Sequence, residues 1–180
     1  LERWTEACPR VIYVPIHHNG YIFQQIIKLR AAEFTNCELI MFVDSDCVFN
    51  KPTTPESFML DQKPLLLKTR YELVGDGICW KAITENVVGW PLDYEYMRRL
   101  PFFFWRSTVE SFRAWQPQLI SRLYKKTDRV FSEFNALGAF AERFEAHNYS
   151  IRDTDNYLPP SQLLQFWSWG GLTNEIRMQI

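Results

Sequence analysis

The sequence predicts an α/β fold, with a mostly parallel sheet flanked by helices in a single domain. Three stretches support this. A β-branched run at 10–16 is followed by an amphipathic pattern at 20–34 and by a near-continuous apolar run at 38–44. A strand, a helix and a strand in this order form a βαβ unit, and an unbroken apolar run is typical of a strand covered on both faces. The length of 180 residues is that of one domain.

The same alternation continues along the chain. Further strands are predicted at 64–71 and 148–153, and further helices after Thr54 and over 130–146. The stretch 101–115 predicts a short strand that turns into a helix at Ser107, with Glu110 completing a capping box. Nothing in the chain resembles a repeat or a linker, so the domain boundaries are taken as 1–180.

Composition excludes several classes of function. Lys and Arg number 20 against 21 Asp and Glu, so no positive field would gather nucleic acid. No apolar stretch approaches the roughly 18–20 residues of a transmembrane helix, and the first residues lack the layout of a secretion signal. The four cysteines form no C-x-x-C pair, which argues against a zinc knuckle or a dithiol redox motif. We therefore expect a cytoplasmic protein without a transmembrane segment.

The stretch "IMFVDSDCVF" at 40–49 places Asp44 and Asp46 where an apolar strand ends. In an open α/β sheet, ligands bind outside the carboxyl ends of the strands. Two carboxylates one residue apart repel each other unless a cation lies between them, and hard oxygen ligands suit Mg²⁺ or Mn²⁺. The pattern therefore predicts a divalent metal site, and the plain alternative is a solvated Asp-Ser-Asp turn.

Two classes of enzyme contain a D-x-D motif at the end of a strand. Glycosyltransferases of the A type bind a nucleotide-diphosphate sugar through a metal held by D-x-D at a strand end. Phosphohydrolases of the haloacid-dehalogenase type use D-x-D-x-[TV], which "DSDCV" also fits, and Asp44 would then be the nucleophile. Such a phosphohydrolase starts with its motif strand and needs later groups for which only Thr69 and Lys81 are available, so the upstream strand and helix favour the transferase. A non-catalytic carbohydrate- or partner-binding module is the third alternative.

The runs "GYIFQQIIKLRAAEF", "LIMFVDSDCVFNKP", "DYEYMRRLPFF" and "FSEFNALGAFAE" resemble a group of microbial and viral glycosyltransferase-like proteins, over roughly residues 10–171. The resemblance implies the Rossmann-type GT-A fold, Mn²⁺ or Mg²⁺ as cofactor, a nucleotide-diphosphate sugar as donor, and a saccharide or other hydroxyl compound as acceptor. Members place D-x-D after about two strands and two helices, whereas one strand is predicted here. We expect a chain that lacks the first nucleotide-binding strand, or a reduced base-binding half.

The resemblance also implies roles for particular residues near the motif. Asp46 would bind the metal directly, and Asp44 would contact the ribose or bind the metal through water. Gln25 and Lys28 lie about one helical turn apart, so both are expected to face the nucleotide. A solvated polar stripe is the alternative for this pair.

Two further residues complete the implied reaction. An inverting transferase needs a general base for the acceptor hydroxyl, and Glu133 stands at the start of the helix that would supply it. A negative charge is also favoured there by the helix dipole, so a structural Glu133 is the alternative. His147 is the expected third metal ligand, with Asp153 and Asp155 as substitutes, and a surface histidine at a helix end is the plain interpretation.

Two loop regions are expected to contact the sugar. Trp169, with Trp167 beside it and Gly170-Gly171 after it, would stack on sugar or base as part of a lid, or form a packed aromatic plug. Asp76, in the irregular stretch 70–80, is the residue expected to bind sugar hydroxyls.

Overall fold

The computed structural model describes residues 20–44, 46–98, 100–125, 131–157, 159 and 162–166. Within these residues, helices and short strands alternate along the chain, which confirms the α/β class. The predicted strand at 10–16 lies outside the described residues. Among the helices described, none is long and apolar enough to cross a membrane.

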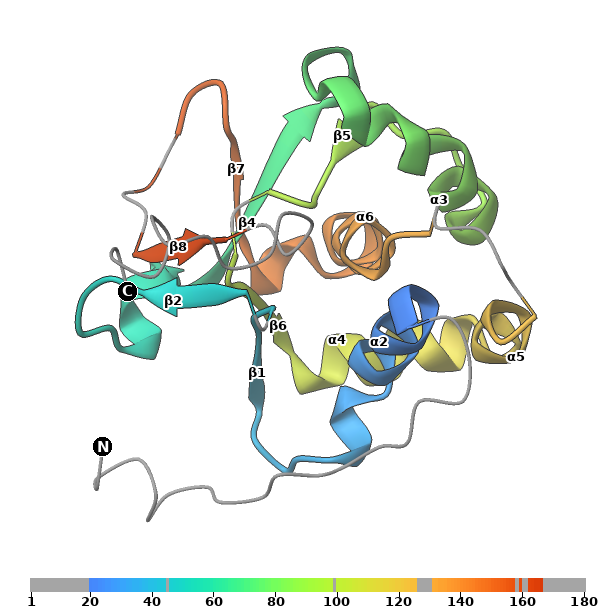
Figure 1. Cartoon of the computed structure of the whole chain (residues 1–180), viewed down its shortest axis with the longest axis horizontal. Helices are drawn as coiled ribbons and strands as arrows, with labels where there is room; N and C mark the ends of the chain where they lie inside the picture. The colour runs from blue at the N-terminus through green and yellow to red at the C-terminus, as the bar shows by residue number, and fades with distance from the viewer. Residues whose placement is uncertain are drawn as a thin grey trace.

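The strands form one central layer with a small ribbon beside it (Figure 1). Their bounds are β1 (Leu39–Phe42), β2 (Cys47–Phe49), β3 (Met59–Leu60), β4 (Lys63–Arg70), β5 (Tyr94–Glu95), β6 (Phe102–Trp105), β7 (Ser150–Asp153) and β8 (Leu163–Gln165). β1 pairs with β6, and β4 pairs with β3, β5 and β7. Contacts between β4 and β6 join these two sheets into the central layer, and β2 pairs with β8 in the ribbon.

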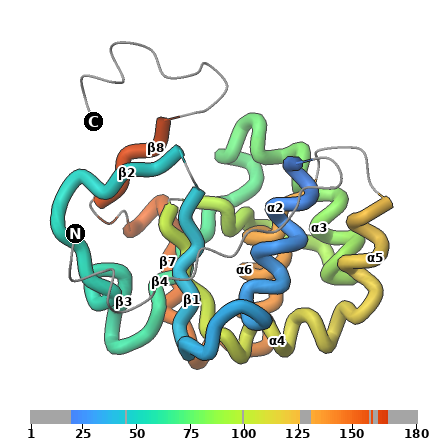
Figure 2. The backbone as a smooth tube through the Cα atoms, turned by 60° about the horizontal axis from the view of Figure 1, so that its bottom comes forward, coloured from blue at the N-terminus to red at the C-terminus, as the bar shows by residue number. Residues whose placement is uncertain are grey.

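The helices gather on the side of the central layer opposite the β2–β8 ribbon (Figures 1 and 2). The α-helices are α2 (Gly20–Leu29), α3 (Lys81–Val88), α4 (Arg106–Trp115), α5 (Leu119–Leu123) and α6 (Glu133–Glu145). The 3₁₀ helices are η1 (Ala31–Glu33), η2 (Pro55–Phe58), η3 (Tyr71–Leu73), η4 (Gly75–Trp80) and η5 (Ala146–Asn148). Helix α6 contacts α2, α3 and α4, so it is the centre of the helical layer.

The prediction of a mostly parallel sheet is wrong for the described strands. Only β4 and β7 pair in parallel among them, and the other four pairs are antiparallel. The apolar run at 38–44 is not covered on both faces. Ile40 and Phe42 are buried, whereas Met41 and Val43 are exposed to 44% and 38%. The strand therefore has the two-faced burial that antiparallel sheets tolerate, with apolar residues on its open face.

Helix α6 is built to be buried. Ser132 is its N-cap, and the Ser132 hydroxyl accepts a hydrogen bond from Asn135 N at 3.3 Å. Every residue from Glu133 to Ala141 is buried, and the small residues among them let neighbouring segments approach. A Cβ at Gly138 would lie 2.4 Å from Tyr96 Cβ, so only glycine permits this approach. The cap and the packing together fix the start of α6, where Glu133 stands.

The strand-to-helix turn at 101–115 is confirmed with a shifted boundary. β6 ends at Trp105 and α4 begins at Arg106, one residue before Ser107. Glu110 does not complete a capping box, because its carboxylate accepts from Arg106 Nε at 2.9 Å. The ion pair between adjacent turns replaces the expected cap.

Candidate functional site

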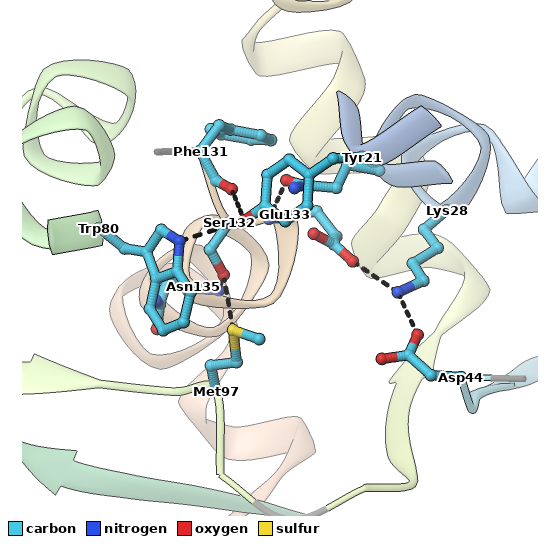
Figure 3. Close-up of polar contacts among 10 residues, drawn as sticks. Tyr21, Lys28, Asp44, Trp80, Met97, Phe131, Ser132, Glu133 and Asn135 are labelled. Atoms are coloured by element: carbon cyan, nitrogen blue, oxygen red, sulfur yellow. Dashed lines mark hydrogen bonds and ion pairs between the residues drawn. The ribbon is translucent and has the colours of Figure 1, made fainter. Parts of the chain in front are cut away.

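The ammonium of Lys28 joins two carboxylates that are far apart in the sequence (Figure 3). Lys28 Nζ donates to Asp44 Oδ1 at 2.7 Å and lies 3.0 Å from Glu133 Oε1. The side chains of Lys28 and Asp44 are 15% and 27% exposed, and that of Glu133 only 5%. The cluster is thus closed on the Glu133 side and open to solvent on the Asp44 side.

Three different elements supply these side chains. Lys28 lies in the last turn of α2, Asp44 follows β1 by two residues, and Glu133 is the first residue of α6. Helix α2 packs on α6, and both lie against the β1–β6 part of the sheet, as Figures 1 and 2 show. The cluster therefore forms just beyond the carboxyl end of β1, where α2 and α6 meet the sheet.

Glu133 is a buried acid paired with one cation, Lys28. Burial raises the pKa of its carboxyl above the usual range, and the nearby positive charge of Lys28 opposes that rise without cancelling it. A carboxyl with a raised pKa accepts a proton more readily near neutral pH. The position of Glu133 is accordingly suited to a general base.

Lys28 is kept charged by its surroundings. Burial alone would lower its pKa, but attraction to Glu133 and Asp44 outweighs burial and the pKa is raised. The ammonium also lies 4.5 Å from the centre of the Phe134 ring, a favourable cation–π contact. Two acids and one aromatic face thus hold a single positive charge here.

Gln25 does not face a ligand, contrary to the expectation from sequence. Its residue is 2% exposed, and its side-chain oxygen accepts a hydrogen bond from Glu133 N at 3.2 Å. The first amide groups of a helix lack partners within the helix, so this bond supplies one for α6. Gln25 therefore positions Glu133, and the prediction that it binds the nucleotide is wrong in this arrangement.

Asp44 and Asp46 of the D-x-D motif lie between β1 and the β2–β8 ribbon. Cys47 N donates to Asp44 O at 3.2 Å, and Phe166 N donates to Asp46 O at 2.7 Å. Burial, with the negative charges of Asp46 and Asp44, raises the pKa of the Cys47 thiol to about 11, so this thiol stays neutral. Asp46 is half-buried, and its Oδ1 has the Cys47 sulfur 3.6 Å away as a weak donor. Both aspartates remain reachable from solvent.

The donor set fits a metal that the substrate helps to bind. Among the described residues, no group of three or more His, Cys, Asp or Glu side chains is close enough to form a metal site. Mg²⁺ is usually bound by one or two carboxylates together with substrate phosphates and water. Asp46, with Asp44 beside it, satisfies that smaller requirement.

The structure does not bring His147 to this site. His147 lies in η5, beyond the C-terminal end of α6, whereas Glu133 is at the N-terminal end. The intervening helix separates the two by about 20 Å at 1.5 Å per residue. Its role as third ligand to Asp44 and Asp46 is therefore wrong for this arrangement, because a rigid helix holds it at the other end of the layer.

Two other predicted ligand contacts involve Asp76 and Trp169. Asp76 is exposed in the first turn of η4, and its role in binding sugar hydroxyls stays a prediction. Trp169 lies outside the described residues. The lid formed by Trp167 and Trp169 therefore stays a prediction.

Sequence reasoning missed two aromatic residues that border the site. Tyr21 OH donates to Phe131 O at 2.9 Å, and Trp80 Nε1 donates to Tyr21 OH at 3.1 Å. Figure 3 shows that these two hydrogen bonds connect η4 with the residues just before α6. Tyr21 lies four residues before Gln25 on α2, so the helical spacing was a signal that the two share a face.

A second buried acid lies at the end of β5. Glu95 is 1% exposed, and its Oε2 is 2.5 Å from Arg98 Nε. Burial raises the pKa of Glu95 to about 7, although Arg98 opposes the rise. Within the described residues, neither oxygen of Glu95 has a partner at hydrogen-bond geometry. A Cβ at Gly77 would lie 3.0 Å from Glu95 Oε1, so η4 packs closely against this carboxylate.

The chain was also compared with known proteins. No protein-family model, no curated protein and no solved structure matches it. The comparisons leave the family open, and the function has to be argued from the site.

Proposed function

We propose that the protein is a metal-dependent glycosyltransferase that moves a sugar from a nucleotide-diphosphate sugar to an acceptor hydroxyl with inversion. The observation that carries this proposal is the Lys28 bridge between Asp44 and Glu133 at the carboxyl end of β1. One cation and three carboxylates, counting Asp46, leave an excess of negative charge there. Such an excess is suited to a divalent cation and the phosphates that accompany it.

Each residue then has a chemical task. Asp46 holds the metal, with Asp44 beside it, and when bound the metal offsets the negative charge that builds on the departing diphosphate. Lys28 contributes a second positive charge next to the leaving group. Glu133 accepts the proton of the acceptor hydroxyl while that oxygen attacks the sugar carbon and the bond to the diphosphate breaks.

Burial of Glu133 supports the role of base. Its 5% exposed side chain is shielded from bulk water, so its proton affinity is set by Lys28 and by burial rather than by solvent. Gln25 fixes the backbone at Glu133, which limits the positions the carboxylate can take. A fixed base of raised pKa suits proton transfer near neutral pH.

The phosphohydrolase alternative lacks comparable support. The Thr69 hydroxyl is paired with that of Thr154, and Lys81 lies over the Tyr71 ring and near Glu85. These contacts occupy the groups that a phosphohydrolase would require beside Asp44. No observation favours a non-catalytic module over the transferase either.

The test is turnover of the donor. The protein is incubated with a panel of nucleotide-diphosphate sugars and Mn²⁺, with and without a saccharide acceptor, and released nucleoside diphosphate is quantified. We expect release from one donor class, lost on adding a chelator and in Asp46→Ala. Release of inorganic phosphate from phosphomonoesters, with no donor turned over, would support the phosphohydrolase and contradict the proposal.

A further inference from the structure

Lys28 forms ion pairs with two acids that differ in solvent exposure. An ammonium has three donors, and here one is taken by Asp44 at 2.7 Å while another points to Glu133 at 3.0 Å. The Asp44 carboxylate is about a quarter exposed, whereas Glu133 is enclosed. A ligand that enters from solvent therefore meets Lys28 from the Asp44 side.

A diphosphate competes with these carboxylates for the ammonium. It carries more negative charge than either acid, and charge-assisted bonds to phosphate are strong. Lysine is a point charge on a flexible four-carbon stem, so it changes partner with little distortion of the helix. The Lys28 side chain is 15% exposed, which leaves it reachable.

Moving Lys28 toward solvent breaks the contact on the enclosed side first. Glu133 is held at its backbone by Gln25 and lies in the first turn of a fully packed helix, so it is not free to follow. The carboxylate of Glu133 would lose its counter-ion and keep its position. A buried carboxylate without a counter-ion binds a proton more strongly.

Resting on the proposed function, we propose that Lys28 binds the donor diphosphate and thereby couples donor binding to release of the base. Without donor, Lys28 holds Asp44 and Glu133 together. With donor, Lys28 binds the diphosphate, and its movement uncovers Glu133, which then accepts the proton of the acceptor hydroxyl. Glu133 is thus available as a base only after the donor has bound, because Lys28 is paired with it until then.

The direct test is the structure of the wild-type protein with Mn²⁺ and a nucleoside diphosphate, using whichever of UDP, GDP, CDP and ADP binds. We expect Lys28 Nζ within about 3 Å of a phosphate oxygen, and beyond hydrogen-bond distance from Glu133. A diphosphate bound beside Asp46 with Lys28 still bridging both carboxylates would overturn the coupling but leave the donor class standing. If none of the four binds, the proposed function fails together with the coupling.

A solution experiment measures the same competition. Glu133→Gln removes one of the two acids that hold Lys28, so the nucleoside diphosphate is expected to bind about three- to tenfold more tightly by calorimetry. Glu142→Gln is the matched control. Glu142 lies near the other end of α6, and its carboxylate pairs with Lys68 of β4. Unchanged affinity in Glu133→Gln, or an equal gain in Glu142→Gln, contradicts the proposal.

Discussion

Glu133 and Glu95 are both buried acids with a basic partner. The partners differ in their distance along the sequence and in the number of acids that they bind. Lys28 reaches Glu133 across 105 positions of sequence and also binds Asp44, whereas Arg98 reaches Glu95 from three residues away and binds no second acid in the described chain. The Glu133 cluster reaches solvent through a second acid, Asp44, whereas the Glu95 pair reaches solvent through its cation, the 33% exposed side chain of Arg98.

The comparison teaches that a perturbed acid alone does not mark a functional site. Burial raises the pKa of both glutamates. What distinguishes the Glu133 cluster is an excess of carboxylates over cations at an accessible strand end. Unbalanced charge at a partly exposed site is suited to a ligand, whereas a balanced ion pair is suited to a structural role.

The largest expected effect is on the rate of sugar transfer, which should depend on Glu133 and not on Glu95. Glu133→Gln should lower the rate of sugar transfer by about 10²–10⁴-fold, since a general base contributes that much. Glu95→Gln should leave the rate within a few-fold, because Glu95 is covered by η4 and does not reach the cluster. The measurement is release of nucleoside diphosphate under saturating donor. Equal losses in the two variants would remove the distinction.

The next effect concerns stability. Lys28→Met leaves the buried Glu133 without its counter-ion, and the free energy of unfolding should fall by about 3–5 kcal/mol. Urea denaturation at neutral pH measures it. The double variant Lys28→Met, Glu133→Gln should recover most of this loss, because the uncompensated acid is then gone. A double variant as unstable as the single one would show that Lys28 acts through its packing on Phe134 instead.

A third effect is the pH dependence that Glu95 confers. Its pKa of about 7 in the folded chain exceeds the usual 4.5, so the native state binds more protons than the unfolded state between these values. Stability should therefore fall as the pH rises from 4.5 through 7, by up to about 3 kcal/mol. The titratable groups facing Glu95 are Arg98, which is charged, and Tyr71 from η3 and Cys79 from η4, whose raised pKa values keep them neutral in this range.

Denaturation series from pH 4.5 to 8 test this in the wild type and in Glu95→Gln. The variant should lose the part of the fall that the wild type shows across this range. Glu133, whose pKa is also raised, contributes in the same direction and is unchanged in the variant. Identical pH profiles for the two proteins would show that Glu95 is not the group that titrates.

The smallest effect tests how closely η4 packs against the Glu95 carboxylate. Gly77→Ala places a Cβ 3.0 Å from Glu95 Oε1 and 3.2 Å from Arg98 Nη2, and should cost about 1–2 kcal/mol of stability. Gly20→Ala is the control, since nothing lies within 4 Å of its Cβ position. A cost no greater than that of the control would mean that η4 shifts freely.

The elements that carry the site could be predicted from local patterns. The helical periodicity after Gly20, the apolar run before Asp44 and the pattern around Glu133 each mark an element that the structure contains. Lys28, Asp44 and Glu133 were singled out separately, and the structure brings them together. Their chemical roles stay predictions.

What sequence could not supply is set by tertiary packing. The antiparallel direction of β6 depends on its pairing with β1, which no local pattern encodes. Gln25 belongs by pattern to a polar stripe, yet the packing of α2 on α6 buries it. His147 was placed by its nearness in sequence to the Glu133 helix, but the direction of α6 carries it away.

The central claim is that the Lys28 cluster and Asp46 bind the diphosphate of a sugar nucleotide, and a thermal-shift screen with UDP, GDP, CDP and ADP, with and without Mn²⁺, tests it most directly. A ligand that binds only the folded state raises the midpoint of unfolding by mass action. We predict a rise with at least one nucleotide that requires Mn²⁺ and disappears in Asp46→Ala. A midpoint unmoved by all four nucleotides, or moved equally in Asp46→Ala, would contradict the account.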